Sequence, residues 1–393
     1  MKTAQRLDLL QTENAFEVLA EVKKLTAAGR DIVSFAIGEP DFDTPENIKQ
    51  AGIDAIKENQ THYSPAGGLP ELRASIAAHY SLTRGIKVAP NHVVVTPGAK
   101  PIILYSLLAC VDPGDEVIYP NPGFPIYQSL IGFLGARTVP VPVREINGQF
   151  TIDPEELKSL ITDKTKMIII NSPHNPTGGV LQQEVLAAVA EIAIKNNLWI
   201  LSDEIYSRII YQDKFYSIAS LPGMQERTII LDGFSKTYAM TGWRIGFGVM
   251  NDELAHWVTR IQINNESCVA TFTQFAAKEA IAGSQAGSEE IIREFAVRKD
   301  LIVSELSQIP GVKCPVPKGA FYVYPNVTEV CKRMGLRNSK ELQQALLHEG
   351  NVAVLPGTAF GPKNDDQEYI RLSFATSQAN ILEGIRRMKR ILA

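Results

Sequence analysis

Short apolar segments alternate with helix-like segments through the middle of the chain, and this alternation limits the possible folds more than any other feature. Several of the apolar segments lack a two-residue alternation of apolar and polar side chains, which is typical of strands covered by helices on both faces. Strands that alternate with helices favour an α/β fold with a mostly parallel sheet. We expect seven strands flanked by helices, at Val93–Thr96, Glu116–Tyr119, Thr138–Val143, Met167–Asn171, Leu198–Ser202, Thr228–Leu231 and Ile245–Val249.

The pattern changes beyond about residue 285, where a long charged helix is followed by Ala320–Tyr324, a helix from Ser339 and short strands near Val352 and Ile370. This part of the chain predicts a smaller α+β domain. We therefore expect residues 1–45 to form an N-terminal arm that joins the small domain. Residues 46–285 should form the large domain, which would hold any cofactor, and residues 286–393 the small C-terminal domain.

Composition excludes several classes of function. The formal net charge is −4 and the chain has no basic run, which argues against binding to nucleic acid or to an anionic membrane surface. Four scattered cysteines without a C-x-x-C pair are typical of a reducing compartment, and the scattered histidines predict no metal site. The N-terminus lacks the apolar stretch of a signal peptide, and the apolar runs are too short to cross a bilayer. We expect a cytoplasmic protein.

Polar and glycine residues concentrate directly after four of the predicted strands. These segments are Pro97–Lys100, Asn171–Gly178, Ser202–Tyr206 and Asp232–Lys236. Ligands of open α/β sheets bind beyond the carboxyl ends of the strands. The four segments therefore predict one shared cleft.

Common nucleotide and hydrolase motifs do not fit these segments. The chain has no P-loop sequence, and Gly246-Phe247-Gly248 lacks the third glycine and the helix of a dinucleotide-binding turn. The segment Gly233–Thr237 is not a nucleophile elbow, because position 237 is threonine where that motif needs glycine.

Pyridoxal phosphate chemistry does fit them, because it requires a lysine, a phosphate-binding turn and a carboxylate aimed at a pyridine nitrogen. Lys236 would form the Schiff base and later move the proton, and Asp203 would keep the pyridine nitrogen protonated. The turn Gly98-Ala99-Lys100 opens a helix, whose free N–H groups suit a phosphate. Ser235 and Arg244 could bind the same phosphate.

Together these segments resemble the class I, fold-type I pyridoxal-phosphate aminotransferases, and they look most like the bacterial aspartate aminotransferase branch. The resemblance extends over nearly the whole chain. It rests on five segments in order, which are Gly38–Phe42, Ser172–Gly178, Ser202–Tyr206, Ser235–Arg244 and Ile370–Ser373.

The resemblance implies a role for each matching residue. Lys236 is the expected catalytic lysine, with Asp203 as the partner of the pyridine nitrogen. The other implied cofactor contacts are Asn175 and Tyr206 to the ring 3-oxygen, Phe124 stacked on the ring, Gly98, Ala99, Lys100, Ser235 and Arg244 at the phosphate, and Tyr63 reaching the phosphate across a homodimer. The substrate contacts would be Gly38, Asn175 and Arg371, with Lys100 pairing with a distal carboxylate.

The implied reaction moves an amino group from an α-amino acid, possibly aspartate or glutamate, to a 2-oxo acid. Three features depart from the family pattern or oppose an acidic substrate. Gly233 stands where serine is frequent, Phe124 stands where aspartate-specific members often have tryptophan, and a carboxylate at Glu13 would repel an acidic substrate. Lys100 could equally serve only to neutralise the phosphate.

Two other functions remain open at this point. A β-lyase that cleaves carbon–sulfur bonds could use the same scaffold and cofactor. A non-enzymatic cofactor-sensing domain of a transcription regulator is the other alternative, although no basic helix-turn-helix module precedes residue 30.

Overall fold

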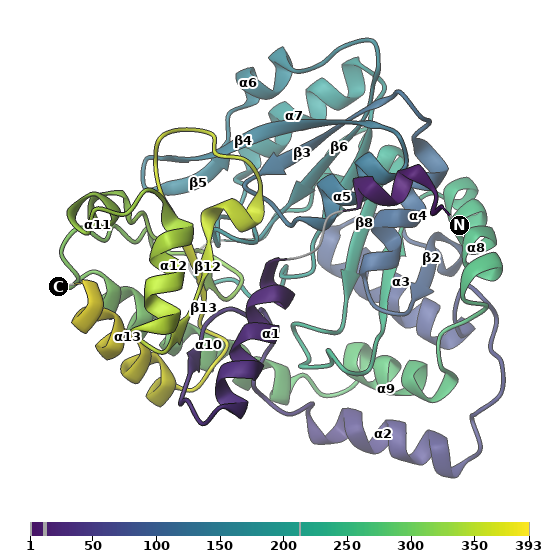
Figure 1. The fold of residues 1–393 in the computed structure, drawn as a ribbon. Coiled ribbons are helices and arrows are strands. Elements are labelled where there is room, and N and C mark those ends of the chain that lie inside the picture. Colours follow the sequence, from purple (N-terminus) through teal and green to yellow (C-terminus); the bar gives the residue numbers. More distant parts are fainter. Residues whose placement is uncertain (1, 11–13, 212–213, 393) are drawn as a thin grey trace.

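The computed structural model describes residues 2–10, 14–211 and 214–392, and places a large helix-flanked sheet beside a smaller unit (Figure 1). Among these residues the large sheet has eight strands in the order β2-β9-β8-β7-β6-β3-β4-β5. The contiguous pairs from β8 to β4 are parallel, whereas β9 and β5 pair antiparallel with their neighbours. This confirms the α/β fold and the mostly parallel sheet. The strands are β2 (Val93–Thr96), β3 (Glu116–Asn121), β4 (Arg137–Ile146), β5 (Gln149–Ile152), β6 (Thr165–Asn171), β7 (Trp199–Asp203), β8 (Thr228–Gly233) and β9 (Gly246–Val249).

All seven predicted strands are present, but the predicted number is one too low because β5 was not expected. Strand β4 continues to Ile146 and turns at Asn147 and Gly148, whose φ angles are 53° and 79°. Two residues with positive φ are what a tight hairpin turn requires, and Asn-Gly is the preferred pair. The Asn-Gly dipeptide was therefore the sequence signal for this extra edge strand.

Helices cover both faces of the large sheet, and the alternation of side chains along β6 shows why its sequence is apolar throughout. Ile168 and Ile170 face one buried cluster, whereas Met167 and Ile169 face another, because successive strand residues point to opposite faces. The first face is covered by α2 (Glu46–Lys57), α3 (Pro70–Arg84), α6 (Pro154–Ser159), α7 (Gln183–Lys195) and α9 (Thr271–Ala282), and the second by α4 (Lys100–Cys110), α5 (Ile126–Phe133) and α8 (Asp252–Asn265).

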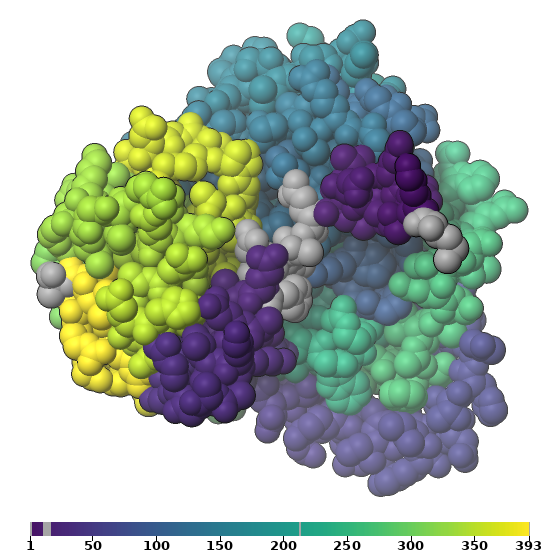
Figure 2. All heavy atoms as spheres, in the orientation of Figure 1, coloured from purple at the N-terminus to yellow at the C-terminus, as the bar shows by residue number. Residues whose placement is uncertain are grey.

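The smaller unit joins the C-terminal part of the chain to an N-terminal segment. Its antiparallel sheet has the order β10-β13-β12, and β1 pairs in parallel with β11, so that Val33 lies opposite Val352. In Figure 2 the purple atoms of α1 lie against the yellow-green C-terminal unit. Its elements are α1 (Asn14–Ala27), β1 (Val33–Ser34), α10 (Ala286–Leu306), β10 (Tyr322–Val323), α11 (Thr328–Arg333), α12 (Ser339–His348), β11 (Val352–Ala353), β12 (Leu355–Pro356), β13 (Ile370–Ser373) and α13 (Gln378–Leu392).

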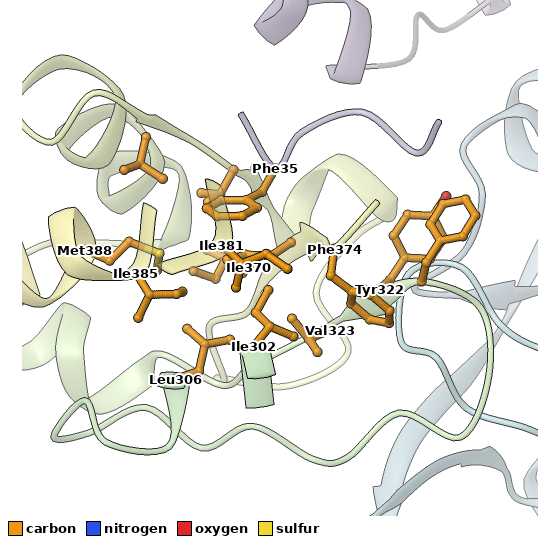
Figure 3. Close-up of a cluster of buried hydrophobic side chains, with 14 of the residues drawn as sticks. Phe35, Ile302, Leu306, Tyr322, Val323, Ile370, Phe374, Ile381, Ile385 and Met388 are labelled. Atoms are coloured by element: carbon orange, nitrogen blue, oxygen red, sulfur yellow. The ribbon is translucent and has the colours of Figure 1, made fainter. Parts of the chain in front are cut away.

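The core of the smaller unit is one cluster of buried apolar side chains. Figure 3 shows Phe35 next to Ile381 and Ile370, with Tyr322 at the side of the cluster that faces the large sheet. The cluster fixes the position of β13 and β10 relative to the ends of the large strands. In the part of the chain that the structure describes, no helix combines the length and the apolar character needed to cross a bilayer.

Candidate active site

A cavity of about 360 Å³ lies beyond the carboxyl ends of the large sheet's strands, between that sheet and the smaller unit. Its volume is in the range of small-molecule sites in proteins. The structure brings eleven of the residues singled out above to its wall, which are Gly38, Ala99, Lys100, Phe124, Asn175, Asp203, Tyr206, Ser235, Lys236, Arg244 and Arg371. Gly98 and Tyr63 do not line it.

Lys236 extends into the cavity from the segment that follows β8. Its Nζ donates a hydrogen bond of 2.6 Å to the carbonyl oxygen of Gly38. The pKa of Lys236 is lowered to about 8, mainly by burial; Glu39 opposes this shift, and nearby cations such as Arg371 contribute to it. Because a neutral amine is the reactive form of lysine, a lowered pKa suits a nucleophile or a general base.

Asp203 is the last residue of β7 and is 5% exposed. Its carboxylate accepts hydrogen bonds from the Tyr127 hydroxyl at 2.5 Å and from the Ile205 backbone N–H at 3.2 Å. Burial nevertheless raises the pKa of Asp203 to about 6. A buried carboxylate at a cavity wall is stabilised by a cation placed against it, and a protonated pyridine nitrogen would be such a cation.

The turn before α4 forms a positively charged end of the cavity. Gly98 has a φ of 86°, and a side chain there would overlap the guanidinium group of Arg244. The glycine therefore lets Arg244 approach the turn, although Gly98 itself does not line the cavity. Arg244 also donates to the Thr241 carbonyl at 2.9 Å. Ala99 and Lys100 line the cavity at the N-terminus of α4, where the positive end of the helix dipole adds to this charge.

Arg371, on β13, supplies a further cationic group of the cavity wall and is 4% exposed. It donates to the Asn175 side-chain oxygen at 3.0 Å and to the Ala36 carbonyl at 2.5 Å. Its guanidinium carbon lies 4.4 Å from the ring centre of Tyr322 and 4.8 Å from that of Phe360. This orientation is held from several sides, which suits a guanidinium that binds a carboxylate.

The aromatic side of the cavity is formed by Phe124 and Tyr206. The Phe124 ring packs edge-on against Tyr127 and lies 5.2 Å from the Lys100 Nζ. Tyr206 is buried, and its hydroxyl lies 2.7 Å from the hydroxyl of Tyr322.

The cavity wall as a whole fits pyridoxal phosphate. Lys100, Lys236, Arg244 and Arg371 bring positive charge, against the carboxylates of Glu39 and Asp203. Such a surplus suits a ligand that carries a phosphate and binds a carboxylate substrate. The described residues contain no group of three or more His, Cys, Asp or Glu side chains that could hold a metal ion.

Three residues considered above remain to be placed, which are Tyr63, Gly233 and Glu13. Tyr63 is 90% exposed and lies away from the cavity of its own chain. A Cβ atom at Gly233 would lie 3.0 Å from the Cα of Gly246, so the neighbouring strand leaves little room for the serine that the family resemblance would place there. Glu13 lies outside the described residues.

The sequence reasoning missed Tyr127, Glu39 and Tyr322, all of which line the cavity. Tyr127 lies three residues after Phe124, and its backbone N–H donates to the Phe124 carbonyl at 3.1 Å in the turn that begins α5, so this spacing was a usable signal. Glu39 follows Gly38 directly. Tyr322 carries no local signal, because only the packing of the smaller unit brings it to Tyr206.

Comparisons with known proteins agree with this chemistry. The family "Aminotransferase class I and II" matches residues 30–388. An aspartate aminotransferase of Pyrococcus abyssi is 41% identical, over 100% of this chain and 98% of that protein. An aromatic-amino-acid aminotransferase of Thermococcus litoralis is 40% identical over 95% of both chains.

The solved structures include a similar protein with the same fold. The aspartate aminotransferase of Thermus thermophilus, with maleate, has a TM-score of 0.94 and 33% identity over 100% of both chains. The lysine, carboxylate and anion-binding groups of the cavity are those that pyridoxal phosphate needs. The chain therefore belongs to the aminotransferase class I and II family, within its aspartate aminotransferase branch, and is a pyridoxal-phosphate-dependent aminotransferase.

Proposed function

We propose that this aminotransferase takes a dicarboxylic amino acid, aspartate or glutamate, as its preferred amino donor and works in the cytoplasm. The observation that carries the proposal is that Arg371 and Lys100 both line the cavity. Arg371 would bind the α-carboxylate, and Lys100 the distal one. The names of the P. abyssi and T. thermophilus relatives support this choice, and the four free cysteines support a reducing compartment.

We propose that the cofactor's two ends are held by different elements. Ser235, Arg244 and the backbone of the turn formed by Gly98, Ala99 and Lys100 would bind the phosphate, and Asp203 would keep a proton on the pyridine nitrogen. Phe124 would stack on the ring, while Asn175 and Tyr206 would donate to its 3-oxygen. These roles are supported by the burial of Asp203 and by the cationic turn before α4.

The residues around Lys236 would carry out the proton transfer. When bound, pyridoxal phosphate supplies a conjugated ring that accepts the electron pair left on the substrate's Cα. Arg371 and Asn175 would hold the α-carboxylate, so that the Cα–H bond faces Lys236. The neutral Lys236 amine would take this proton from Cα and return it to the cofactor carbon on the other side of the substrate nitrogen. The hydrogen bond from Lys236 to the Gly38 carbonyl supports this placement of Nζ.

The experiment is a comparison of kcat/KM for aspartate, alanine and phenylalanine, with 2-oxoglutarate as acceptor. We expect wild type to prefer aspartate, and Lys100→Ala to lower the aspartate-to-alanine ratio by about 30-fold, which is roughly 2 kcal/mol for a desolvated charge pair. Lys158→Ala is the matched control, because Lys158 lies on α6 and is absent from the cavity wall. A ratio that survives Lys100→Ala would overturn the acidic-donor assignment and leave the aminotransferase activity standing. A preference for phenylalanine would favour an aromatic donor, as in the T. litoralis relative.

We also propose a homodimer in which Tyr63 reaches the partner's cofactor phosphate. The support is that an aromatic side chain is 90% exposed, and that Leu108 and Trp257 expose further apolar surface at 47% and 49%. Light scattering should give twice the chain mass of 43.2 kDa, and Tyr63→Phe should speed the loss of cofactor on dilution. A monomer with full activity would contradict this.

We propose the domain limits as residues 1–45, 46–285 and 286–393, for the arm, the large domain and the small domain. The pairing of β1 with β11 supports an arm that belongs with the small domain. Limited proteolysis should cut first near residues 45 and 285 and leave a stable fragment between them.

A further inference from the structure

Tyr322 touches two functional ends of the cavity although no motif marks it. It lies on β10 of the smaller unit and is 1% exposed, and Figure 3 shows it at the edge of the apolar cluster that faces the large sheet. Its hydroxyl oxygen lies 2.7 Å from that of Tyr206, and its ring centre lies 4.4 Å from the Arg371 guanidinium. One buried side chain of the smaller unit thus contacts both Tyr206 and Arg371.

Gly38 makes room for the Tyr322 hydroxyl. A Cβ atom on Gly38 would overlap the hydroxyl oxygen of Tyr322. The backbone carbonyl of the same glycine accepts the 2.6 Å hydrogen bond from the Lys236 Nζ. The hydroxyl therefore lies against the segment that orients the lysine, and that segment has no side chain at this point.

The single proton of the Tyr206 hydroxyl decides which of the two hydroxyls donates in the hydrogen bond between them. Burial, followed by the proximity of Tyr322, raises the Tyr206 pKa well above its ordinary value, so that this hydroxyl keeps its proton. A tyrosine hydroxyl has one proton to donate. If Tyr206 gives that proton to an acceptor in the cavity, its bond with Tyr322 must be one that it accepts.

We propose that Tyr322 is a positioning residue, which donates a hydrogen bond to the Tyr206 hydroxyl and thereby directs the Tyr206 proton at the 3-oxygen of the cofactor ring. The inference rests on the proposed function, since it takes Tyr206 to face that oxygen. A hydroxyl that accepts a hydrogen bond is a stronger donor, because chains of hydrogen bonds polarise one another. Tyr322 would therefore help Tyr206 to stabilise negative charge on the ring oxygen.

The register of the small sheet links this effect to substrate binding. Tyr322 lies opposite Ser373 on β13, two residues from Arg371. The side chain that orients Tyr206 is thus held by the same sheet that carries the proposed carboxylate-binding arginine. Correct placement of β10 and β13 would serve both ends of the site together.

The test is a spectrophotometric pH titration of the cofactor-loaded enzyme, in which the visible band reports the protonation of the nitrogen that joins Lys236 to the cofactor. A donor to the ring oxygen stabilises its negative charge when that nitrogen loses its proton, so removing the donor should raise the pKa of the transition. We expect Tyr206→Phe to raise it strongly. Tyr322→Phe should raise it by about 0.5–1 unit, a threefold to tenfold change in the equilibrium constant.

The double variant separates this inference from the proposed function. If Tyr322 acts through Tyr206, Tyr322→Phe should add no shift in the Tyr206→Phe background. A full extra shift there, or none in wild type, would overturn the role of Tyr322. An unchanged transition in Tyr206→Phe would instead refute the proposed role of Tyr206, and the lack of any visible band would refute the assignment of Lys236.

Two further variants control for effects that Tyr322→Phe could have on folding. Tyr211→Phe is the matched control, because it also removes a tyrosine hydroxyl hydrogen bond close by, to the Ala320 carbonyl, yet Tyr211 does not line the cavity. It should leave the transition unchanged. If Tyr322→Phe does not fold, Gly38→Ala should displace the Tyr322 hydroxyl and raise the same pKa. An unchanged pKa in Gly38→Ala would then count against the proposal.

Discussion

Uptake of pyridoxal phosphate by the cofactor-free protein should depend on pH through the Lys236 amine, and the geometry of the site sets the midpoint. Only the neutral amine attacks an aldehyde. Burial lowers the pKa of Lys236 from 10.5 to about 8. At pH 7.5 a group with a pKa near 8 is neutral in roughly a quarter of molecules, against about 0.1% for an ordinary lysine. The cavity should therefore raise the concentration of reactive amine about 10²-fold.

The assay is stopped-flow mixing of the cofactor-free protein with pyridoxal phosphate, followed by the visible band between pH 6 and pH 10. The rate should rise about tenfold per pH unit below the midpoint and level off above pH 8. Glu39 stabilises the ammonium form, so Glu39→Gln should move the midpoint down, whereas Lys100→Ala should move it up.

Glu58→Gln is the charge-matched control, because Glu58 follows α2 and does not line the cavity. Ionisations of the free cofactor are common to all variants and cancel in the comparison. A midpoint near 10 in wild type, or an upward shift in Glu39→Gln, would refute the reasoning from burial and neighbouring charge.

Three further predictions concern single side chains. Lys236→Ala should still bind the cofactor through the phosphate contacts but lose turnover by about 10²- to 10⁴-fold, the usual contribution of positioned proton transfer; an active variant would end the assignment. Arg371→Ala should lower kcat/KM for amino acids by the equivalent of about 2–5 kcal/mol and leave the cofactor Kd nearly unchanged. Loss of the cofactor would instead show that Arg371 binds the cofactor and not the substrate carboxylate. Arg84 and Glu204 form a buried ion pair of 2.9 Å with side-chain exposures of 8% and 1%. Arg84→Met, which leaves the Glu204 charge buried, should lower the free energy of unfolding by about 3–5 kcal/mol in urea titrations; a loss below 1 kcal/mol would show that the carboxylate finds another partner.

The strands of the large sheet could be predicted because their burial leaves a simple trace in the sequence. Ile168 and Ile170 pack on one face and Met167 and Ile169 on the other, which produces an unbroken apolar run. Strand β5 has the pattern of a half-buried edge strand, in which Phe150 and Ile152 are buried and the residues before each of them are intermediate.

The candidate site was predictable only where topology alone brings residues together. Asp203 ends strand β7 and Lys236 follows strand β8, and the carboxyl ends of neighbouring parallel strands meet at one edge of the sheet. Arg371 and Gly38 reach the same cavity by the packing of the smaller unit, which no local pattern encodes. Their implied roles came from resemblance to a family.

The glycines of the site show what kind of information the sequence lacks. Gly38 and Gly98 stand in segments that the sequence marks as loops, but their neighbours explain why glycine is needed there. Gly38 leaves space for the Tyr322 hydroxyl, and Gly98 leaves space for the Arg244 guanidinium. In both cases the neighbour lies more than 100 positions away in the chain. A glycine in a motif thus identifies a close approach, and only the fold identifies the group that approaches. For Gly38 that group is a hydroxyl beside Tyr206 and Lys236, so the space is a feature of the reaction site as much as of the loop.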